Sequence, residues 1–361
     1  MKKIFLLSMF FAFGVSTQAV PVRPGIKKVL TLADGTAVAA ELKGDEYMAW
    51  WETADGRKFV QSESNEKTFV AADINAMRAQ SAERRAIVDA ACAKRMACAR
   101  TPKKRTLGGE HITYTGKKKG IIILANFTDS KFDEKHDNQY YVNVANTPGF
   151  TSDEGYVGSV RDYFYAQSNG TFELDFDVIG PIELSHGYAW YGEDDTSRRD
   201  IRVGNMIKEA VEAADKVGAD WASYDWDGDG ECDQVFVLYA GLGQASSGDA
   251  NTIWAHKFQM SACREINRTP VTTECGIVVD TYACCNENQP VMKDGQITNE
   301  YRPEGIGTIC HEFSHCLGFP DMYDISNQGG YAMDRWTVMS TGLYNGNSMI
   351  PANYSAWERI Y

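Results

Sequence analysis

The sequence predicts an α+β fold, in which a larger unit of strands and helices follows a small unit of strands and one helix. Three observations lead to this prediction. Residues 29–72 alternate apolar and polar side chains, the pattern of half-buried strands. Residues 117–129 and 232–241 contain continuous apolar runs, which are typical of strands buried on both faces. Residues 198–218 repeat apolar side chains with a helical period and end at a glycine.

The N-terminus has the pattern of an export signal. A basic start is followed by an apolar run at residues 4–15 and then by small residues that end at Ala19. We therefore expect residues 1–19 to be a signal peptide, and the mature protein to be secreted, periplasmic or held at the cell surface. No other apolar run approaches the ~20 residues of a membrane-spanning helix, so no transmembrane segment is expected after signal removal.

Residues 20–106 are predicted to form a separate N-terminal unit. Its strands surround two Asp-Gly turns, at residues 34–35 and 55–56, and a helix rich in Ala and Arg follows at 74–100. Pro102 ends this helix. The basic, glycine-containing residues after it have no apolar periodicity, which is typical of a linker.

A larger unit is predicted over residues 107–361. Its expected elements are a strand at 117–129, a helix at 157–170, strands at 171–184, a helix at 198–218, a strand at 232–241 and then loops to about residue 305. The chain stops within a helical pattern that begins after Pro351. We therefore expect this unit to be truncated at its C-terminus.

The composition is that of a globular protein, with 43% hydrophobic and 24% charged residues. The formal net charge is −13. An acidic surface repels phosphate, so nucleic acid is not an expected partner. The same charge suits a protein that holds divalent cations.

Nine cysteines lie in a chain whose predicted export permits disulfides. Because nine is odd, at least one cysteine stays unpaired. Cys310 and Cys316 lie on one predicted helix with a rise of about 9 Å between them, beyond the about 7 Å that a disulfide tolerates. The same argument applies to Cys92 and Cys98 within the helix at 74–100. Pairings remain open among the others, at positions 232, 263, 275, 284 and 285.

The segment HEFSHCLGFPD, residues 311–321, is the strongest chemical signal in the chain. On a helix running from about residue 306 to Gly318, His311 and His315 lie on one face, one turn apart, where both imidazoles can reach a single zinc ion. Glu312 lies beside them without coordinating and is positioned to take a proton from water. Asp321 follows the helix as a third ligand. The alternative is a helix with two hydrogen-bonded core histidines.

Two further motifs also indicate metal binding. Met339, in the segment DRWTVMSTG, has the spacing from the histidines of a methionine turn beneath a metal site. The segment DWDGDGECD, residues 225–233, opens like an EF-hand loop and predicts a structural calcium ion. Its candidate ligands are Asp225, Asp227, Asp229, Glu231 and Asp233. The alternative for this loop is an exposed acidic turn before a strand.

Several segments between about residues 120 and 345 resemble the immune inhibitor A-like family of secreted zinc metallopeptidases, which is related to the metzincins. The matching segments are GIIILANFTD, GSVRDYFYAQSNGTFEL, DWDGDGECDQVFVLYAG, HEFSHCLGFPDMYD and WTVMSTG. The resemblance implies a metzincin-like peptidase domain with a mixed twisted sheet, an active-site helix and a Met-turn.

The resemblance also implies residue roles. It makes His311 and His315 zinc ligands, Glu312 the catalytic base and Met339 the Met-turn residue. The broader metzincin pattern has histidine as its third ligand; this chain has Asp321 there, with Asp324 as the competing candidate.

The resemblance further identifies residues 20–106 as a pro-region. The basic stretch around residues 92–105 is then a site where an activating protease cuts. A thiolate from Cys92 or Cys98 is one way to occupy the zinc in the latent state, and a structural or free role for these cysteines is the alternative.

These observations predict a secreted zinc metalloendopeptidase that hydrolyses protein or peptide substrates. Two other interpretations stay open. One is a secreted, calcium-stabilised binding protein with an inactive peptidase-like domain. The other is a zinc hydrolase that acts on something other than peptides.

Overall fold

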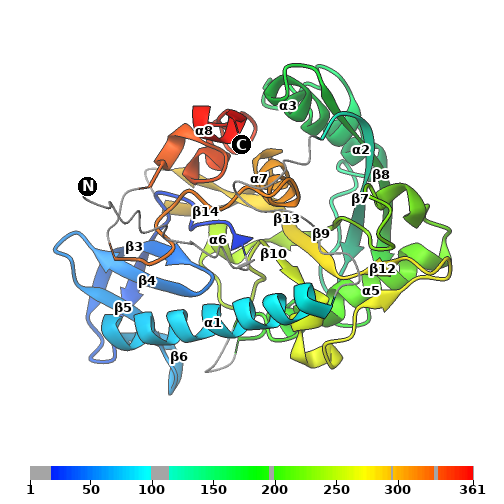
Figure 1. Ribbon diagram of the computed structural model, residues 1–361. Coiled ribbons are helices and arrows are strands. Elements are labelled where there is room, and N and C mark those ends of the chain that lie inside the picture. The colour runs from blue at the N-terminus through cyan, green and yellow to red at the C-terminus, as the bar shows by residue number, and fades with distance from the viewer. Residues whose placement is uncertain (1–17, 99–113, 195–198, 294–295, 329–331, 361) are drawn as a thin grey trace, which may run out of the picture.

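The computed structural model describes residues 18–98, 114–194, 199–293, 296–328 and 332–360. Within these residues a 12-stranded sheet mixes parallel and antiparallel pairs, and a second sheet has two strands. The expected signal peptide up to residue 17 and the basic stretch from residue 99 lie outside the described residues, as do the side chains of Cys92 and Cys98. Figure 1 shows the arrangement of the elements.

The N-terminal strands form an antiparallel meander, as their alternating pattern predicts. The strands are β2 Lys27–Thr31, β3 Ala37–Asp45, β4 Met48–Thr53, β5 Lys58–Ser62 and β6 Asn65–Ala71. Gly35 and Gly56, in the two Asp-Gly turns, both have φ of +84°, a conformation that glycine adopts without strain. The predicted helix follows as α1, Ile74–Cys98, and runs along the lower side of the molecule in Figure 1.

The meander continues the sheet of the larger unit. Strand β2 pairs in parallel with β14, Gln296–Pro303, through Lys27 and Gln296. The strand order is β6-β5-β4-β3-β2-β14-β13-β9-β7-β8. The two units expected from the sequence therefore share one sheet in the structure.

One end of the sheet, in the larger unit, consists of parallel strands, as the apolar runs predict. These are β7 Gly116–Asn126, β8 Phe172–Glu183 and β9 Val235–Leu242, with β7 between the other two. Neighbouring side chains enter different cores, because successive residues of a strand point to opposite faces. Ile122 and Leu124 join one buried cluster, and Ile121 and Ile123 join the other.

The loops expected up to residue 305 are mostly strands, so that prediction is wrong. The structure has β10 His256–Gln259, β11 Val271–Thr272, β12 Val278–Val279, β13 Thr281–Lys293 and β14. Strand β13 was obscured in the sequence because it is rich in polar residues, three of which (Asn286, Glu287 and Gln289) are buried. Glu287 is satisfied by backbone N–H groups of Asp133 and Gly241, so the polar side chain fits inside the sheet.

Helices cover both faces of the sheet formed by β7, β8 and β9. The amphipathic helix α5, Val203–Lys216, contributes to one core, and the helices α2 Asn138–Asn146, α3 Val160–Gln167 and α7 Gly307–Cys316 contribute to the other. Short helices complete the described secondary structure: α4 Tyr188–Tyr191, α6 Gln244–Ser247 and α8 Ala356–Ile360, with single turns at Trp221–Tyr224, Met260–Ala262, Arg264–Ile266, Asp334–Trp336 and Thr341–Tyr344. Helix α7 lies near the middle of the molecule, between β13 and α3 (Figure 1).

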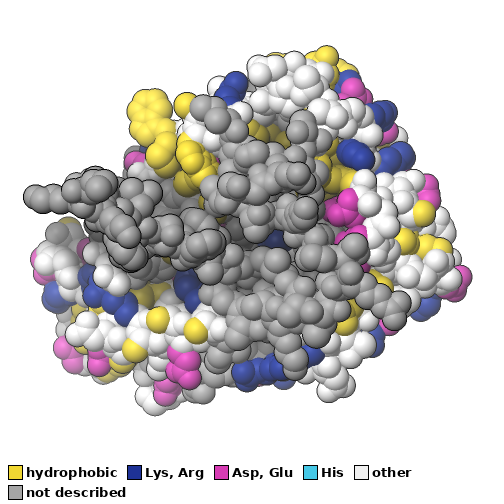
Figure 2. Space-filling model, in the orientation of Figure 1, with side chains coloured by type: hydrophobic (Ala, Val, Ile, Leu, Met, Phe, Trp, Pro, Cys, Tyr) yellow, Lys and Arg dark blue, Asp and Glu magenta, His cyan; other side chains and the backbone are white. Residues whose placement is uncertain are grey.

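On the face drawn in Figure 2, hydrophobic side chains gather at the upper left, over the C-terminal elements. Trp336 is 81% exposed and Ile350 is 53% exposed in this part of the chain. Among the described helices, none has the length and apolar character needed to cross a membrane. The five cysteines whose pairings were left open form no disulfide with one another.

Candidate metal centre

Helix α7 carries the histidine motif and is buried along its whole length. It begins after Ile306 and ends at Cys316, close to the bounds predicted from the sequence. Gly318 then has φ of +96°, and the chain turns back on itself. This turn brings Asp321 to the face of the helix that presents His311 and His315.

Each histidine is oriented by a backbone carbonyl. His311 Nδ1 lies 2.7 Å from the oxygen of Val338, and His315 Nδ1 lies 2.6 Å from the oxygen of Phe319. A carbonyl can only accept, so each Nδ1 carries the proton and each Nε2 presents a lone pair. This is the hydrogen bonding usual for metal-binding histidines. It also argues against two ordinary core histidines. With the proton on each Nδ1, the two facing Nε2 atoms are both acceptors and cannot hydrogen-bond to each other.

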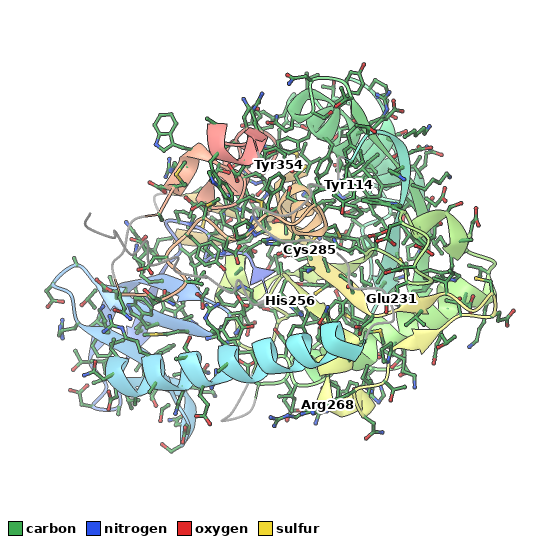
Figure 3. All side chains as sticks on the ribbon, in the orientation of Figure 1. Tyr114, Glu231, His256, Arg268, Cys285 and Tyr354 are labelled. Atoms are coloured by element: carbon green, nitrogen blue, oxygen red, sulfur yellow. The ribbon has the colours of Figure 1, made fainter. Side chains whose placement is uncertain are left out.

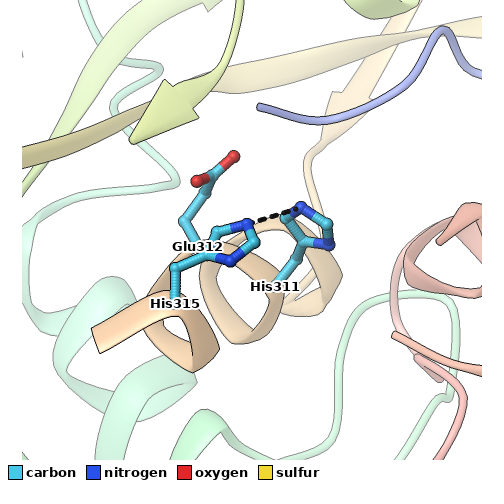
Figure 4. A group of neighbouring side chains, drawn as sticks. All are labelled: His311, Glu312 and His315. Atoms are coloured by element: carbon cyan, nitrogen blue, oxygen red, sulfur yellow. Dashed lines mark hydrogen bonds between the residues drawn. The ribbon is translucent and has the colours of Figure 1, made fainter. Parts of the chain in front are cut away.

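Three atoms form a nearly equilateral triangle at this point. The two Nε2 atoms of His311 and His315 are 3.2 Å apart (Figure 4), and Asp321 Oδ1 lies 3.3 Å from the first and 3.4 Å from the second. Ligands bound at about 2.0–2.1 Å in a tetrahedral arrangement lie about 3.3–3.4 Å apart. The donor set and its spacing therefore fit a zinc ion, with one face of the tetrahedron supplied by the protein.

The electrostatics of this triangle agree with a cation site. Asp321 Oδ1 is buried and accepts no hydrogen bond, which is costly unless a cation neutralises it. Burial opposes ionisation of Asp321, but the two histidines outweigh it and hold its pKa at about 2. Burial lowers the pKa of His315 to about 4, so this ring is neutral at pH 7, as a metal ligand must be.

Asp324, the competing third ligand, is turned away from the histidines. Its Oδ1 accepts from the backbone N–H of Ser326, and its Oδ2 accepts from the N–H of Gln328. Its carboxylate is therefore used in hydrogen bonds within the loop of residues 324–328. The structure brings Asp321, and not Asp324, together with the histidine pair.

Glu312 lies beside the triangle with a carboxylate that has no hydrogen-bond partner. Both of its oxygens are buried and unpaired, and the residue is 0% exposed. Figure 4 shows its side chain next to His315, outside the pair of facing Nε2 atoms. Burial raises the pKa of Glu312 well above its ordinary value; the charges of Asp321 and Glu46 raise it further, and Lys257 opposes them. An unpaired buried carboxylate of raised pKa is suited to accept a proton.

Met339 lies beneath the site in a fully buried turn. The preceding residue, Val338, supplies the carbonyl that orients His311, and Met339 O accepts from the backbone N–H of Met322, next to Asp321. The turn therefore links the histidine helix to the loop of the third ligand. The Met-turn role of Met339 stays a prediction.

Strand β1, Gln18–Ala19, at the end of the predicted signal peptide, and Glu46 of the N-terminal unit lie close to the site, which no local sequence pattern indicated. Strand β1 pairs with β10 and contacts α7. In Figure 4 the blue N-terminal segment passes close to the histidine pair. Glu46, between β3 and β4, has a buried, unpaired Oε2, and the charge of Asp321 contributes to its raised pKa after burial and Asp45.

The acidic loop forms a compact turn next to α7. Side-chain oxygens of Asp225, Asp227 and Asp229 all lie within 4.8 Å of one another. Asp225 also accepts hydrogen bonds from the backbone N–H groups of residues 228, 229 and 230. Glu231 lies beside β12 (Figure 3), to which it is bridged at Val278.

The residues at the end of this loop contact helix α7 directly. Asp233 Oδ2 accepts from the backbone N–H of Trp226, which closes the loop. Gln234 Nε2 donates to the carbonyl of Glu312 at 3.3 Å, and Cys316 Sγ lies 2.5 Å from Gln234 Oε1. The loop is therefore coupled to the histidine helix, although the two are far apart in sequence.

Comparison with known proteins identifies the family. The profile described as immune inhibitor A peptidase M6, catalytic domain, matches residues 113–361. The chain belongs to the peptidase M6 family. The matched M6 segment contains α7, the acidic loop and the Met339 turn, and excludes the N-terminal meander and α1.

Two M6 relatives are similar over much of the chain. The pre-pro-metalloprotease PrtV of Vibrio cholerae is 25% identical over 243 residues, which cover 58% of this chain and 25% of that protein. Immune inhibitor A of Bacillus thuringiensis is 25% identical over 281 residues, which cover 68% of this chain and 39% of that protein. The matched parts are thus less than half the length of these relatives.

A solved structure, metalloproteinase-II from Bacteroides fragilis, aligns over 94% of this chain and 84% of that one, with 10% identity and a TM-score of 0.32. A likeness of this size supports no argument about the fold, so the assignment to the M6 family depends on the sequence comparisons.

Proposed function

We propose that this M6 domain is a zinc-dependent endopeptidase that hydrolyses protein or peptide substrates. The observation that carries the proposal is the triangle of His311 Nε2, His315 Nε2 and Asp321 Oδ1 beside the unpaired carboxylate of Glu312. Three protein ligands leave one position open, which is the arrangement of a catalytic zinc site.

The chain's own residues divide the work of hydrolysis. His311, His315 and Asp321 would hold the zinc, which supplies a Lewis acid for the peptide carbonyl and lowers the pKa of water. Glu312 takes a proton from the attacking water and then donates it to the leaving amine. Burial raises the pKa of Glu312, which makes its carboxylate a stronger base for the first of these steps.

The N-terminal unit acts in this proposal as a pro-region that blocks the site. Two features support it: the approach of Glu46 to the site, and the anchoring of the end of β3 and of the turn that follows it. Asp45, the last residue of β3, pairs with Arg85 of α1 at 2.7 Å and accepts from Asn327 Nδ2 at 3.2 Å. Arg78 of α1 donates to the carbonyl of Asn327 at 3.0 Å. The N-terminal unit is therefore bound to the loop that follows Asp321. A cut in the basic stretch before residue 106 by an activating protease would release the N-terminal unit from the site.

The acidic loop is proposed to bind a structural calcium ion. Convergent carboxylates of Asp225, Asp227 and Asp229 support this, since like charges repel unless a cation lies between them. The contact of Gln234 with Glu312 gives the ion a function, because an ordered loop fixes the side of α7 that carries the catalytic residues.

Export is the remaining part of the proposal. It rests on the apolar N-terminal run of this sequence, and the relative from Vibrio cholerae is itself named a pre-pro-metalloprotease. Proteins outside the cytoplasm are then the substrates.

A casein digest tests the proposed activity. The full chain, cut in the basic stretch, should digest casein, lose activity with a zinc chelator and regain it when zinc is restored. Glu134→Gln, at an exposed glutamate, serves as the matched control for Glu312→Gln. A cut chain that folds, binds zinc and leaves casein intact would instead indicate a binding protein or a hydrolase for other substrates.

A further inference from the structure

Hydrogen bonds to its backbone hold the segment from Val20 to Arg23 against the larger unit. Val20 N–H donates to the carbonyl of Ala255, and Val20 O accepts from the indole of Trp254 at 2.8 Å. The hydroxyl of Tyr344 donates to Pro21 O at 2.7 Å, and Arg23 N–H donates to Ala245 O at 3.0 Å. These bonds use the backbone of the segment, so another extended peptide can make them too.

The side chain of Arg23 enters a polar pocket formed by the larger unit. Although it is an arginine, Arg23 is only 7% exposed, and its Nη2 lies 3.4 Å from Asn347 Oδ1. Asn347 in turn donates to Glu154 at 3.4 Å. Glu304 is 8% exposed and is the carboxylate with the largest electrostatic effect on Arg23. Glu304 Oε1 and Arg23 Nη1 are both buried without a hydrogen-bond partner, so this pocket is held by charge more than by fixed hydrogen bonds.

Arg23 is the main cation that compensates the charge of Glu304. Arg302 has a smaller effect on Glu304 and is itself paired with Glu154 at 3.3 Å. When the N-terminal segment leaves, a buried carboxylate loses its main counter-charge. A buried carboxylate without a counter-charge is costly, so the vacated pocket favours another cationic side chain.

The pocket adjoins the start of the histidine helix. Gly307, the first residue of α7, donates its backbone N–H to the carbonyl of Ser348 at 2.8 Å, next to Asn347, and Glu304 lies three residues before Gly307 in the chain. The chain direction also matters: β1 contacts α7, and Arg23 follows it by a few residues. A peptide that copies this path has its cleaved bond beside α7 and its basic side chain on the C-terminal side.

We propose that Glu304, with Glu154 and Asn347, forms a substrate subsite for an Arg or Lys side chain that lies within about five residues C-terminal to the cleaved bond, and that Arg23 occupies this subsite in the uncut chain. The inference rests on the proposed peptidase function. It assigns the enzyme a preference for basic stretches of protein substrates.

The test is a set of fluorogenic peptides assayed with the full chain after cleavage in the basic stretch. The peptides share one sequence, and Arg, Gln or Glu is placed in turn at each of the five positions after the cleaved bond. At one position the kcat/KM for Arg should exceed that for Gln about tenfold or more, with Glu poorer than Gln. Glu304→Gln should remove most of this Arg:Gln ratio, Glu304→Asp should restore part of it, and the exposed Glu300→Gln should leave it unchanged.

The ratio compares two peptides on one sample, so a partly unfolded variant does not distort it. If Glu304→Gln does not fold, Glu154→Gln, at a more exposed carboxylate, should still lower the ratio. Peptides cleaved without any preference for Arg, or a preference that survives in both variants, would overturn the subsite while leaving the peptidase intact. A cut enzyme that cleaves neither these peptides nor casein would overturn the proposed function, and the subsite with it.

Discussion

The ion pair between Arg85 and Asp45 provides a test of how the N-terminal unit blocks the site. Asp45 is 1% exposed and receives Arg85 Nη2 at 2.7 Å. Removal of one partner from a buried ion pair costs about 3–5 kcal/mol, because the other charge stays buried and uncompensated. Asp45 keeps hydrogen bonds from Tyr47, Met48 and Asn327, so we expect the lower end of this range for Arg85→Met.

This loss has a measurable consequence for the uncut chain. If about 3 kcal/mol is lost from the docking of the β3–β4 turn, the population with an open site rises about 100-fold. The assay is the basal rate of the uncut Arg85→Met chain on a quenched fluorescent peptide, compared with the uncut wild type. Arg57→Met is the matched control: its pair with Asp55 is exposed, and such pairs contribute about 0–1 kcal/mol.

The result that would refute the reasoning is specific. If Arg85→Met lowers the melting temperature of the uncut chain while its basal rate stays at the wild-type level, the ion pair stabilises the unit without controlling the site. An equal rise in Arg57→Met would show that the effect does not depend on burial.

Three further predictions concern the metals and pH. Asp321→Asn should lower the zinc content of the purified chain well below one per chain, whereas Asp324→Asn should leave it near one; metal analysis that shows the reverse would move the third ligand to Asp324. Calcium at 100 times its Kd should stabilise the wild type by about 2.7 kcal/mol, and Asp227→Ala combined with Asp229→Ala should abolish this gain in thermal unfolding without changing zinc content. Burial lowers the pKa of His256 to about 4 from an ordinary value of 6.5, so the unfolded chain binds a proton more strongly than the folded chain does. The free energy of unfolding is therefore highest above pH 6.5 and declines as the pH falls toward 4. The loss approaches about 3 kcal/mol in chelator-treated protein, and urea unfolding of His256→Asn at pH 7 and 4.5 should show a smaller change; an equal change would assign the effect to other groups.

The candidate site was largely predictable because its geometry is local. His311, Glu312 and His315 depend only on the pitch of one helix, and Gly318 turns the chain so that Asp321 returns to the same face. The choice between Asp321 and Asp324 required the structure, because it depends on where the loop directs each carboxylate.

The parts that the sequence did not predict depend on long-range contacts. Strand β13 was missed because Glu287 has the character of a surface residue. It is buried in the structure, where backbone N–H groups more than 40 residues away in sequence donate hydrogen bonds to its carboxylate. The approach of Glu46 and Arg23 to the site joins segments separated by more than 200 residues. No periodicity in the sequence encodes such contacts.

The central claim is that Glu312 moves the proton while the two histidines and Asp321 hold the zinc. Glu312→Gln in the cut chain tests it most directly, with zinc content and peptide turnover measured on the same sample and Glu134→Gln as the control. We predict about one zinc per chain and peptide turnover slower by roughly two to four orders of magnitude, since general-base catalysis contributes a factor of this size. Turnover within a few-fold of wild type, with zinc still bound, would contradict the account.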